Sequence, residues 1–167
     1  MNDLTPRHQA MLDTWQQHTY AEFVLKDVDA ALATMTDNPH VLRVPCGMGA
    51  FGRAAVRAFY NQFLASVPPD FELTTVSQTF GDERIVEEFV ARFMHSIDMH
   101  WLLPGVPPTH RRVEFGLVVI IQFEGDKIAH EHLYWDQATL LSQLGILDHP
   151  AAAGGRSSAA ELRRLVA

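Results

Sequence analysis

The segment HEHLYWDQ, residues 130–137, concentrates side chains that could carry out chemistry. It holds two histidines, a glutamate, a tyrosine, a tryptophan and an aspartate. A carboxylate can accept a proton as a general base, and an imidazole exchanges a proton near neutral pH. Alternate side chains of a strand point to opposite faces, so at most half of this segment can serve one pocket.

Glu131 and His95 form the preferred acid–base pair. An apolar pocket tends to raise the pKa of a carboxyl group such as Glu131, and a nearby imidazole can carry the proton onward. Arg43 could bind a substrate carboxylate or enolate, or it could neutralise a buried acid such as Glu131 or Asp98. The competing interpretation makes Glu131 a surface or interfacial residue and His95 a hydrogen-bonded core residue.

His130 and His132 have the i, i+2 spacing with which one strand face can bind a metal ion. His100 or His110 could complete such a site. The sequence has no strong metal-binding signature beyond this spacing. We therefore expect no metal and assign the pair to an interface or a sheet edge, with a histidine-ligated metalloenzyme as an alternative.

Length and composition predict a single globular domain. The 167 residues are 47% hydrophobic, and the formal net charge is −7. This charge argues against nucleic acid or an anionic membrane as a partner, and no apolar run approaches the roughly 20 residues that span a bilayer. The lone Cys46 can form no internal disulfide, which fits a cytoplasmic protein. The segment GMGAFG lacks the context of a dinucleotide site, so no cofactor is expected.

The spacing of apolar residues changes from a helical period to alternation near residue 70. Helices are expected over residues 7–23, 28–35, 53–66 and 137–144, with Asp27 and Asp136 as N-caps. Strands are expected over residues 40–45, 71–80, 84–99, 112–124 and 127–136, with a glycine-rich loop after the first. We predict an α+β domain over residues 1–147, with helices on one face of a curved antiparallel or mixed sheet, and a linker-like tail with a short terminal helix over 148–167.

The link EGDK between the last two strands predicts a two-residue hairpin turn. Uninterrupted pairing from this turn places Ile120 opposite Glu131 and Gly116 opposite Trp135. Both strand faces are apolar at their centre, so both are expected to be covered, one of them by the helices and a pocket. One predicted face combines Gly116, Val118 and Ile120 with Glu131, Leu133 and Trp135; the other combines Phe115, Leu117, Val119 and Ile121 with His130, His132, Tyr134 and Asp136.

The segments FEGDKIAHEHLYWDQATLLSQLGIL, HVLRVPCGMGAFG and DMHWLLPGVPPTHRRVEF resemble the NTF2-like superfamily, in particular its SnoaL-like branch of polyketide-cyclase and ester-cyclase relatives. The resemblance implies a cone of helices and sheet around a pocket and, as in dimeric members, a homodimer. It does not select a reaction, because the superfamily includes isomerases, dehydratases, epoxide hydrolases, cyclases and proteins without known catalysis.

The resemblance also implies places for single residues. In epoxide-hydrolase-like relatives the second aromatic of a YWD pattern points into the pocket, which puts Trp135, Leu133 and Glu131 inside. Arg43 matches a polar pocket position two residues before a proline. The chain departs from these relatives at Leu133, where a catalytic aspartate often stands. It departs again at Phe89 and Ala91, which replace an arginine and aspartate pair, so epoxide hydrolysis by that apparatus is not expected.

These observations predict a pocket for a small, mostly apolar, carbonyl-bearing molecule. Glu131 would abstract a proton next to the carbonyl, His95 would shuttle it or donate to the carbonyl oxygen, and Arg43 would stabilise the oxyanion, with isomerisation, dehydration or cyclisation as the outcome. The rival hypothesis is a ligand-binding or dimerisation module without catalysis. The residues expected to contact the ligand are Trp135, Asp98, Trp101, Tyr134, His132, Phe93 and Leu133.

Overall fold

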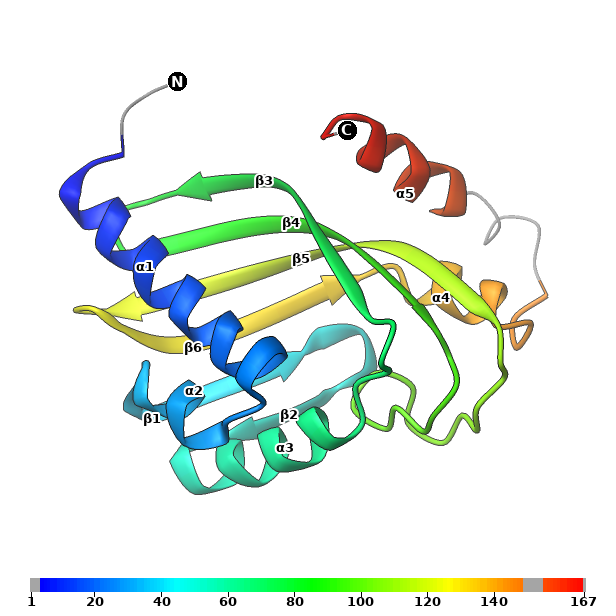
Figure 1. Ribbon diagram of the computed structural model, residues 1–167, viewed down its shortest axis with the longest axis horizontal. Helices are drawn as coiled ribbons and strands as arrows, with labels where there is room; N and C mark the ends of the chain where they lie inside the picture. Colours follow the sequence, from blue (N-terminus) through cyan, green and yellow to red (C-terminus); the bar gives the residue numbers. More distant parts are fainter. Residues whose placement is uncertain (1–3, 149–154, 167) are drawn as a thin grey trace.

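The computed structural model describes residues 4–148 and 155–166 (Figure 1). Its α-helices are α1 (Pro6–Tyr20), α2 (Val28–Ala33), α3 (Arg53–Ala65), α4 (Gln137–Gln143) and α5 (Gly155–Arg164). Its strands are β1 (Met35–Arg43), β2 (Met48–Phe51), β3 (Glu72–Phe80), β4 (Arg84–Met94), β5 (Arg112–Glu124) and β6 (Lys127–Trp135). None of the helices in the described ranges is both long and apolar enough to cross a membrane.

The strands form one six-stranded sheet in the order β2-β1-β6-β5-β4-β3. Neighbouring strands are antiparallel except for β1 and β6, which are parallel. Helices α1 to α3 cover one face, here called the inner face, where α1 crosses the long strands and α3 lies along β1 and β2 (Figure 1). The predicted α+β architecture, with helices packed on a curved mixed sheet, is confirmed.

Local sequence signals account for most helix ends. Asp27 caps α2 by accepting hydrogen bonds from the backbone N–H groups of Asp29 and Ala30, and Asp136 caps α4 in the same way through Thr139. Both caps were predicted from the sequence. Helix α1 runs on into a wider π-helical turn, Ala21–Leu25, that ends at Lys26 in the left-handed conformation. This turn carries Glu22 into the interior.

Two strand predictions near the first hairpin are wrong. Strand β1 begins at Met35 rather than near residue 40, and the expected loop at residues 46–52 contains β2, which pairs with β1. Gly49 permits this close pairing, because a Cβ atom at that position would collide with the carbonyl oxygen of Val41.

Strand β4 ends at Met94, five residues before the predicted end. The chain instead turns at Met99, whose carbonyl oxygen accepts hydrogen bonds from the backbone N–H groups of Leu102 and Leu103. This turn buries Trp101 and Leu103 under the end of the sheet, and that burial outweighs continued strand pairing.

The hairpin of β5 and β6 starts in the predicted register but does not keep it. Phe123 lies opposite Ile128, and then a bulge at Ala129 shifts the pairing by one residue, so that Ile121 lies opposite Glu131. Beyond the bulge, Glu131 and the alternate residues after it share the inner face with Ile121 rather than with Ile120. The predicted combination of faces is therefore wrong, because one extra residue reverses the side of every later side chain.

Helix α5 lies against the outer face of β5, where Gly116 meets Leu162. The predicted linker falls largely on residues 149–154, which lie outside the described residues.

Candidate active site

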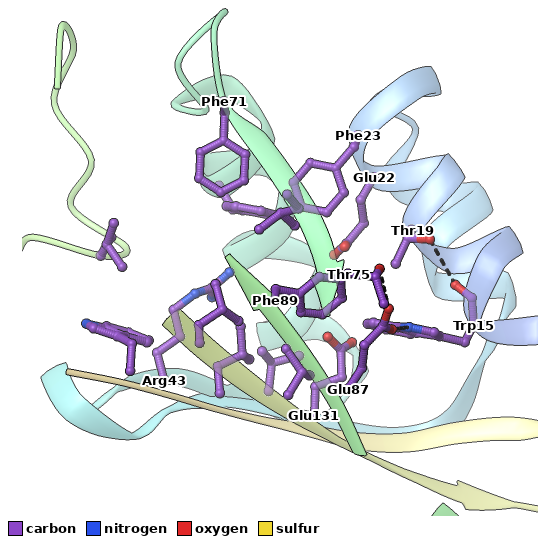
Figure 2. Close-up of a pocket in the computed structure, with 18 of the residues that line it drawn as sticks. Trp15, Thr19, Glu22, Phe23, Arg43, Phe71, Thr75, Glu87, Phe89 and Glu131 are labelled. Atoms are coloured by element: carbon purple, nitrogen blue, oxygen red, sulfur yellow. Dashed lines mark hydrogen bonds between the residues drawn. The ribbon is translucent and has the colours of Figure 1, made fainter. Parts of the chain in front are cut away.

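A cavity of about 530 Å³ lies between α1, its π-helical turn and the inner face of the sheet (Figure 2). Aromatic and aliphatic side chains form most of its wall, and a few polar groups interrupt them. In Figure 2, Arg43 lies on one side of Glu131, and Glu87 with Trp15 lies on the other. The polar lining therefore has distinct parts on the two sides of Glu131.

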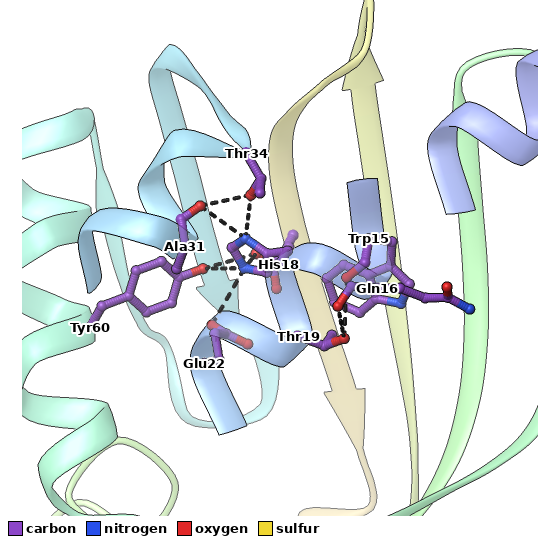
Figure 3. Close-up of polar contacts among 9 residues, drawn as sticks. Trp15, Gln16, His18, Thr19, Glu22, Ala31, Thr34 and Tyr60 are labelled. Carbon is purple, nitrogen blue, oxygen red and sulfur yellow. Dashed lines mark hydrogen bonds and ion pairs between the residues drawn. The ribbon is translucent and has the colours of Figure 1, made fainter. Parts of the chain in front are cut away.

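His18 is the centre of a buried hydrogen-bond network (Figure 3). Its Nδ1 atom lies 2.7 Å from Thr34 Oγ1 and 3.2 Å from the carbonyl oxygen of Ala31. Its Nε2 atom lies 3.1 Å from Tyr60 Oη. Two carboxylate oxygens complete the set: Glu131 Oε1 at 3.1 Å and Glu22 Oε1 at 3.4 Å from Nε2.

These contacts define His18 as an imidazolium. A carbonyl oxygen only accepts hydrogen bonds, so Nδ1 must carry a proton toward Ala31. Ionised carboxylates also only accept, so Nε2 must carry one toward Glu22 and Glu131. Burial lowers the pKa of His18, but the two carboxylates outweigh it and raise the pKa to about 10. The ring is positively charged at neutral pH.

Glu131 is correspondingly an ionised carboxylate. Tyr60 donates a hydrogen bond of 2.9 Å to its Oε1 atom, the same oxygen that faces His18. Burial raises the pKa of Glu131, but His18, the Tyr60 hydroxyl and Arg43 together lower it below its ordinary value. The expectation that an apolar pocket raises this pKa is therefore wrong, because three donors or cations surround the carboxylate. The described hydrogen bonds all end on Oε1, which leaves Oε2 open to a ligand.

Arg43 lies at the end of β1 with only 3% of its surface exposed. Its guanidinium carbon lies 4.3 Å from the ring centre of Phe59, 4.7 Å from that of Phe63 and 5.1 Å from that of Trp101. Its Nε and Nη1 atoms are buried and have no hydrogen-bond partner among the described residues. Burial lowers the pKa of Arg43, yet a guanidinium stays charged in proteins. This cation is held by aromatic rings and has hydrogen bonds left to donate.

Glu87 is the second carboxylate on the sheet side of the cavity. Trp15 Nε1 donates to its Oε2 atom at 2.5 Å, and Thr75 Oγ1 donates to its Oε1 atom at 2.7 Å. Both oxygens are thus occupied, and the side chain is buried. Glu87 is suited to orienting Trp15 and Thr75 at the cavity wall. Glu131 differs because its Oε2 atom is open to a ligand.

The structure brings together only part of the predicted site. The predicted residues that line the cavity are Arg43, Trp101, Glu131, Leu133 and Trp135; those that do not are Phe93, His95, Asp98, His132 and Tyr134. The predicted pairing of Glu131 with His95 does not occur, and His18 occupies the position next to the carboxylate.

His95 follows the end of β4 and is fully buried away from the cavity. Its Nδ1 atom accepts a hydrogen bond from the backbone N–H of Thr109. Burial lowers the pKa of His95, which favours a neutral ring. Its contacts tie the long loop after β4 to the sheet, in agreement with the competing interpretation of a core histidine.

Three of the remaining predicted residues lie elsewhere for simple geometric reasons. His132 and Tyr134 alternate with the cavity residues of β6 and therefore lie on the outer face. Asp98 is exposed on the loop after β4. Phe93 is on the inner side, as expected, but it is enclosed by the core and packs on Phe71.

Sequence reasoning missed His18, Glu22 and Tyr60 as functional candidates. A signal was present, because His18 and Glu22 follow Met11 and Trp15 at spacings that place all four on one helix face. Polar residues on an otherwise apolar helix face need buried partners. Nothing in the sequence indicated that one of these partners, Glu131, would come from the far end of the chain.

A separate group of possible metal ligands lies outside the cavity. Among the described residues, His40, His130 and His132 form the one cluster of three such side chains. The third member is His40 from β1 and not His100 or His110, the residues that could complete a site in the alternative metal-binding interpretation. These two histidines lie on the loop after β4 and do not join the cluster.

Comparisons with known proteins agree with the fold. The family model of SnoaL-like polyketide cyclases matches residues 14–144. A comparison with curated protein sequences finds no match. The family match covers all of the cavity elements from the second half of α1 to α4.

Several solved structures are similar to this chain over most of its length. A provisionally assigned SnoaL-like polyketide cyclase from Jannaschia sp. CCS1 is similar with a TM-score of 0.73 and 15% identity, over 89% of this chain and 100% of that protein. AclR, a provisionally assigned hydroxylase from Streptomyces galilaeus, has a TM-score of 0.63 and 18% identity, over 84% and 98%. The epoxide hydrolase/cyclase-like enzyme SalBIII, with a role in pyran ring formation in the polyether salinomycin, has a TM-score of 0.56 and 18% identity, over 82% and 95%. At these identities the likeness establishes the fold.

Proposed function

Because this chain belongs to the SnoaL-like polyketide cyclase family, we propose that it catalyses a cofactor-independent acid–base reaction on a small, mostly apolar molecule with a carbonyl group. The observation that carries the proposal is the pairing of an ionised buried carboxylate with an unpartnered guanidinium in one cavity. Glu131 is the base, and Arg43 stabilises the charge that develops on the carbonyl oxygen. Isomerisation, dehydration or cyclisation can follow from the resulting enolate.

The strength of the base limits the substrate. A carboxylate whose pKa is lowered is a weak base, so it can abstract a proton only from an acidic carbon. A methylene group between two carbonyl groups is acidic in this sense, because both oxygens share the negative charge. We therefore propose a 1,3-dicarbonyl compound, flanked by apolar or aromatic groups that fit the cavity wall.

The network around His18 supports this role. It holds Glu131 Oε1 through His18 and Tyr60, so that Oε2 is fixed in position for the incoming proton. When Oε2 takes the proton, the charge of His18 stays paired with Glu22. His18, rather than the predicted His95, is the imidazole beside Glu131, and it orients and stabilises the carboxylate instead of shuttling the proton.

Deuterium exchange tests the proposal without knowledge of the product. The protein would be incubated in D2O with cyclic and aromatic 1,3-diketones, and the loss of the proton between the carbonyl groups would be followed by NMR. We expect the wild type to accelerate exchange, Glu131→Gln to lose at least about 100-fold of this rate, and Arg43→Met at least about 10-fold. Each variant removes one group of the proposed pair and keeps the side-chain length similar.

The matched control is Glu88→Gln, a substitution on the outer face of β4 next to Glu87. It should leave the exchange rate unchanged. The proposal fails if compounds that bind in the cavity exchange no faster than in buffer, which would favour the ligand-binding module. It also fails if Glu131→Gln exchanges them as fast as the wild type.

We also propose that the protein forms a homodimer through the outer face of the sheet. The support is an apolar outer surface at which Phe51 is 67% exposed and Tyr134 is 42% exposed. Mass measurement by light scattering at several concentrations would test it. Twice the chain mass supports the dimer, and a single chain mass contradicts it.

A further inference from the structure

Three histidines meet on the outer face of the sheet, at the junction of its parallel strands. His40 in β1 lies directly opposite His130 in β6, and His132 follows two residues later on the same face. The ring centres of His40 and His130 are 4.5 Å apart, and those of His130 and His132 are 4.4 Å apart. The pairing of the two strands therefore gathers residues that are 90 positions or more apart in the chain.

The ring nitrogens of this cluster lie at distances suited to a shared ligand. Each histidine offers one nitrogen, and the three atoms lie within 4.8 Å of one another. The Nε2 atoms of His40 and His132 are 2.9 Å apart. Nitrogens bound to one tetrahedral zinc ion are about 3.4 Å apart, as follows from Zn–N bonds of about 2.0 to 2.1 Å. Small side-chain rotations would bring all three to this spacing.

We propose that His40, His130 and His132 bind one divalent transition-metal ion of the Zn²⁺, Cu²⁺ and Ni²⁺ class. Three imidazole nitrogens without a carboxylate favour these ions over Mg²⁺ and Ca²⁺, which prefer oxygen ligands. The rings form a tripod on one side of the ion, and its other positions remain open to further ligands. All three side chains are half-buried, so the ion can reach them.

The surroundings favour a metal over a purely structural cluster. Among the described residues no carboxylate forms an ion pair with these three rings, and the Nε2 atoms of His40 and His132 are hydrogen-bonded only to each other, so a metal ion could replace the proton they share. Phe51 stacks on His40 at 5.1 Å between ring centres and limits the movement of that ring. Two of the three ligands stand on β6, which is paired on both sides, so the tripod is anchored on a rigid part of the sheet.

This site is separate from the cavity. Glu131 lies between His130 and His132 in sequence but points to the opposite face of β6. Metal binding is therefore proposed independently of the reaction in the cavity. Either proposal can fail while the other holds.

Metal titration of protein without an affinity tag tests the site. After treatment with EDTA and its removal, Zn²⁺ binding would be measured by equilibrium dialysis, and Co²⁺ binding by its visible absorption. We expect one Zn²⁺ per chain and a Co²⁺ spectrum typical of nitrogen ligands. His40→Gln and His132→Gln should each weaken binding by at least about 10-fold.

The matched controls are His100→Gln and His110→Gln, which change histidines outside the cluster and should keep wild-type affinity. Circular dichroism would confirm that each variant is folded. If a cluster variant does not fold, the Co²⁺ spectrum of the wild type tests the site instead: absorption typical of nitrogen ligands supports it, and the absence of a Co²⁺ band contradicts it. The proposal is overturned if the wild type binds well below one equivalent of Zn²⁺ and gives no Co²⁺ band, or if folded His40→Gln and His132→Gln proteins bind as tightly as the controls.

Discussion

Two buried cationic side chains, His18 and Arg43, lie near the Glu131 carboxylate and differ in how fully their nitrogens are hydrogen-bonded. His18 is fully buried, and both of its ring nitrogens have hydrogen-bond acceptors. Arg43 is nearly as buried, but it is stacked among aromatic rings, and two of its nitrogens have no hydrogen-bond partner in the part of the chain that the structure describes. One buried positive charge is therefore surrounded by hydrogen-bond acceptors, and the other mainly by aromatic rings.

This difference indicates that the charge of His18 stabilises the fold, whereas the charge of Arg43 is available to bind a ligand. A buried ion pair stabilises little in total, but the loss of one member leaves the other charge uncompensated. This applies to His18, which has two carboxylates beside it. Arg43 contributes less to the charge of Glu131 than His18 does, and its Nε and Nη1 atoms have no hydrogen-bond partner among the described residues, so its retention points to binding. Stability and binding should respond in opposite ways to substitution of the two residues.

The largest effect on stability is expected for His18→Gln. It removes the cation between Glu22 and Glu131 and should lower the free energy of unfolding by about 3 to 5 kcal/mol. Urea unfolding followed by circular dichroism measures this change. The exposed His100→Gln variant is the matched control and should stay close to the wild type. A His18→Gln protein as stable as this control would contradict the claim that the charge of His18 stabilises the fold.

Tyr60→Phe should have a smaller effect of about 1.5 to 3 kcal/mol, because it removes one hydrogen bond to a charged carboxylate. The same urea experiment applies, with Tyr20→Phe at the exposed end of α1 as the control. If both tyrosine variants lose equal stability, the hydroxyl of Tyr60 does not support the ionised form of Glu131.

The pH dependence of stability should carry the signature of His18. Its pKa rises from 6.5 to about 10 on folding, so the folded protein holds more protons than the unfolded chain between these values. The stabilising contribution is complete below pH 6.5 and disappears as the pH rises through about 10. The slope can reach about 1.4 kcal/mol per pH unit for one proton.

Urea unfolding at pH 7, 8 and 9 would measure this slope in the wild type and in Tyr20→Phe as a control that keeps the network. Both should lose stability steadily as the pH rises. A wild-type stability that is flat or rises over this range would show that His18 is not an imidazolium in the folded protein.

The smallest change in stability is expected for Arg43→Met, within about 1 kcal/mol of the wild type, because its Nε and Nη1 atoms have no hydrogen-bond partner to lose among the described residues. Its affinity for a 1,3-diketone should nevertheless fall at least about 10-fold. Calorimetric titration and urea unfolding would give the two values, with Arg57→Met on the outside of α3 as the control. A large loss of stability with unchanged affinity would instead assign Arg43 to neutralising Glu131.

The fold could be predicted well where one signal dominated. Strand β5 has the predicted ends, Arg112 and Glu124, because inward and outward residues alternate without interruption between them. The face of β6 could not be predicted in the same way. Ala129 is a small residue that fits either a regular ladder or a bulge, and only tertiary packing decides between them.

The candidate site was predicted in part for a related reason. Glu131 and Arg43 were found because the resemblance placed them, although the predicted strand register combined the wrong faces. His18 was missed because its partners come from α2, α3 and β6, and pairing across such distances depends on the whole topology. His40 was missed as a neighbour of His132 because the parallel pairing of β1 with β6 was not predicted.

The most direct test of the central claim is a crystal structure of the protein soaked with a cyclic 1,3-diketone. We predict that one carbonyl oxygen lies within hydrogen-bond distance of the Arg43 guanidinium, and that the carbon between the carbonyl groups faces Glu131 Oε2. A diketone bound in the cavity with its oxygens turned away from Arg43, or with that carbon remote from Glu131, would contradict the account.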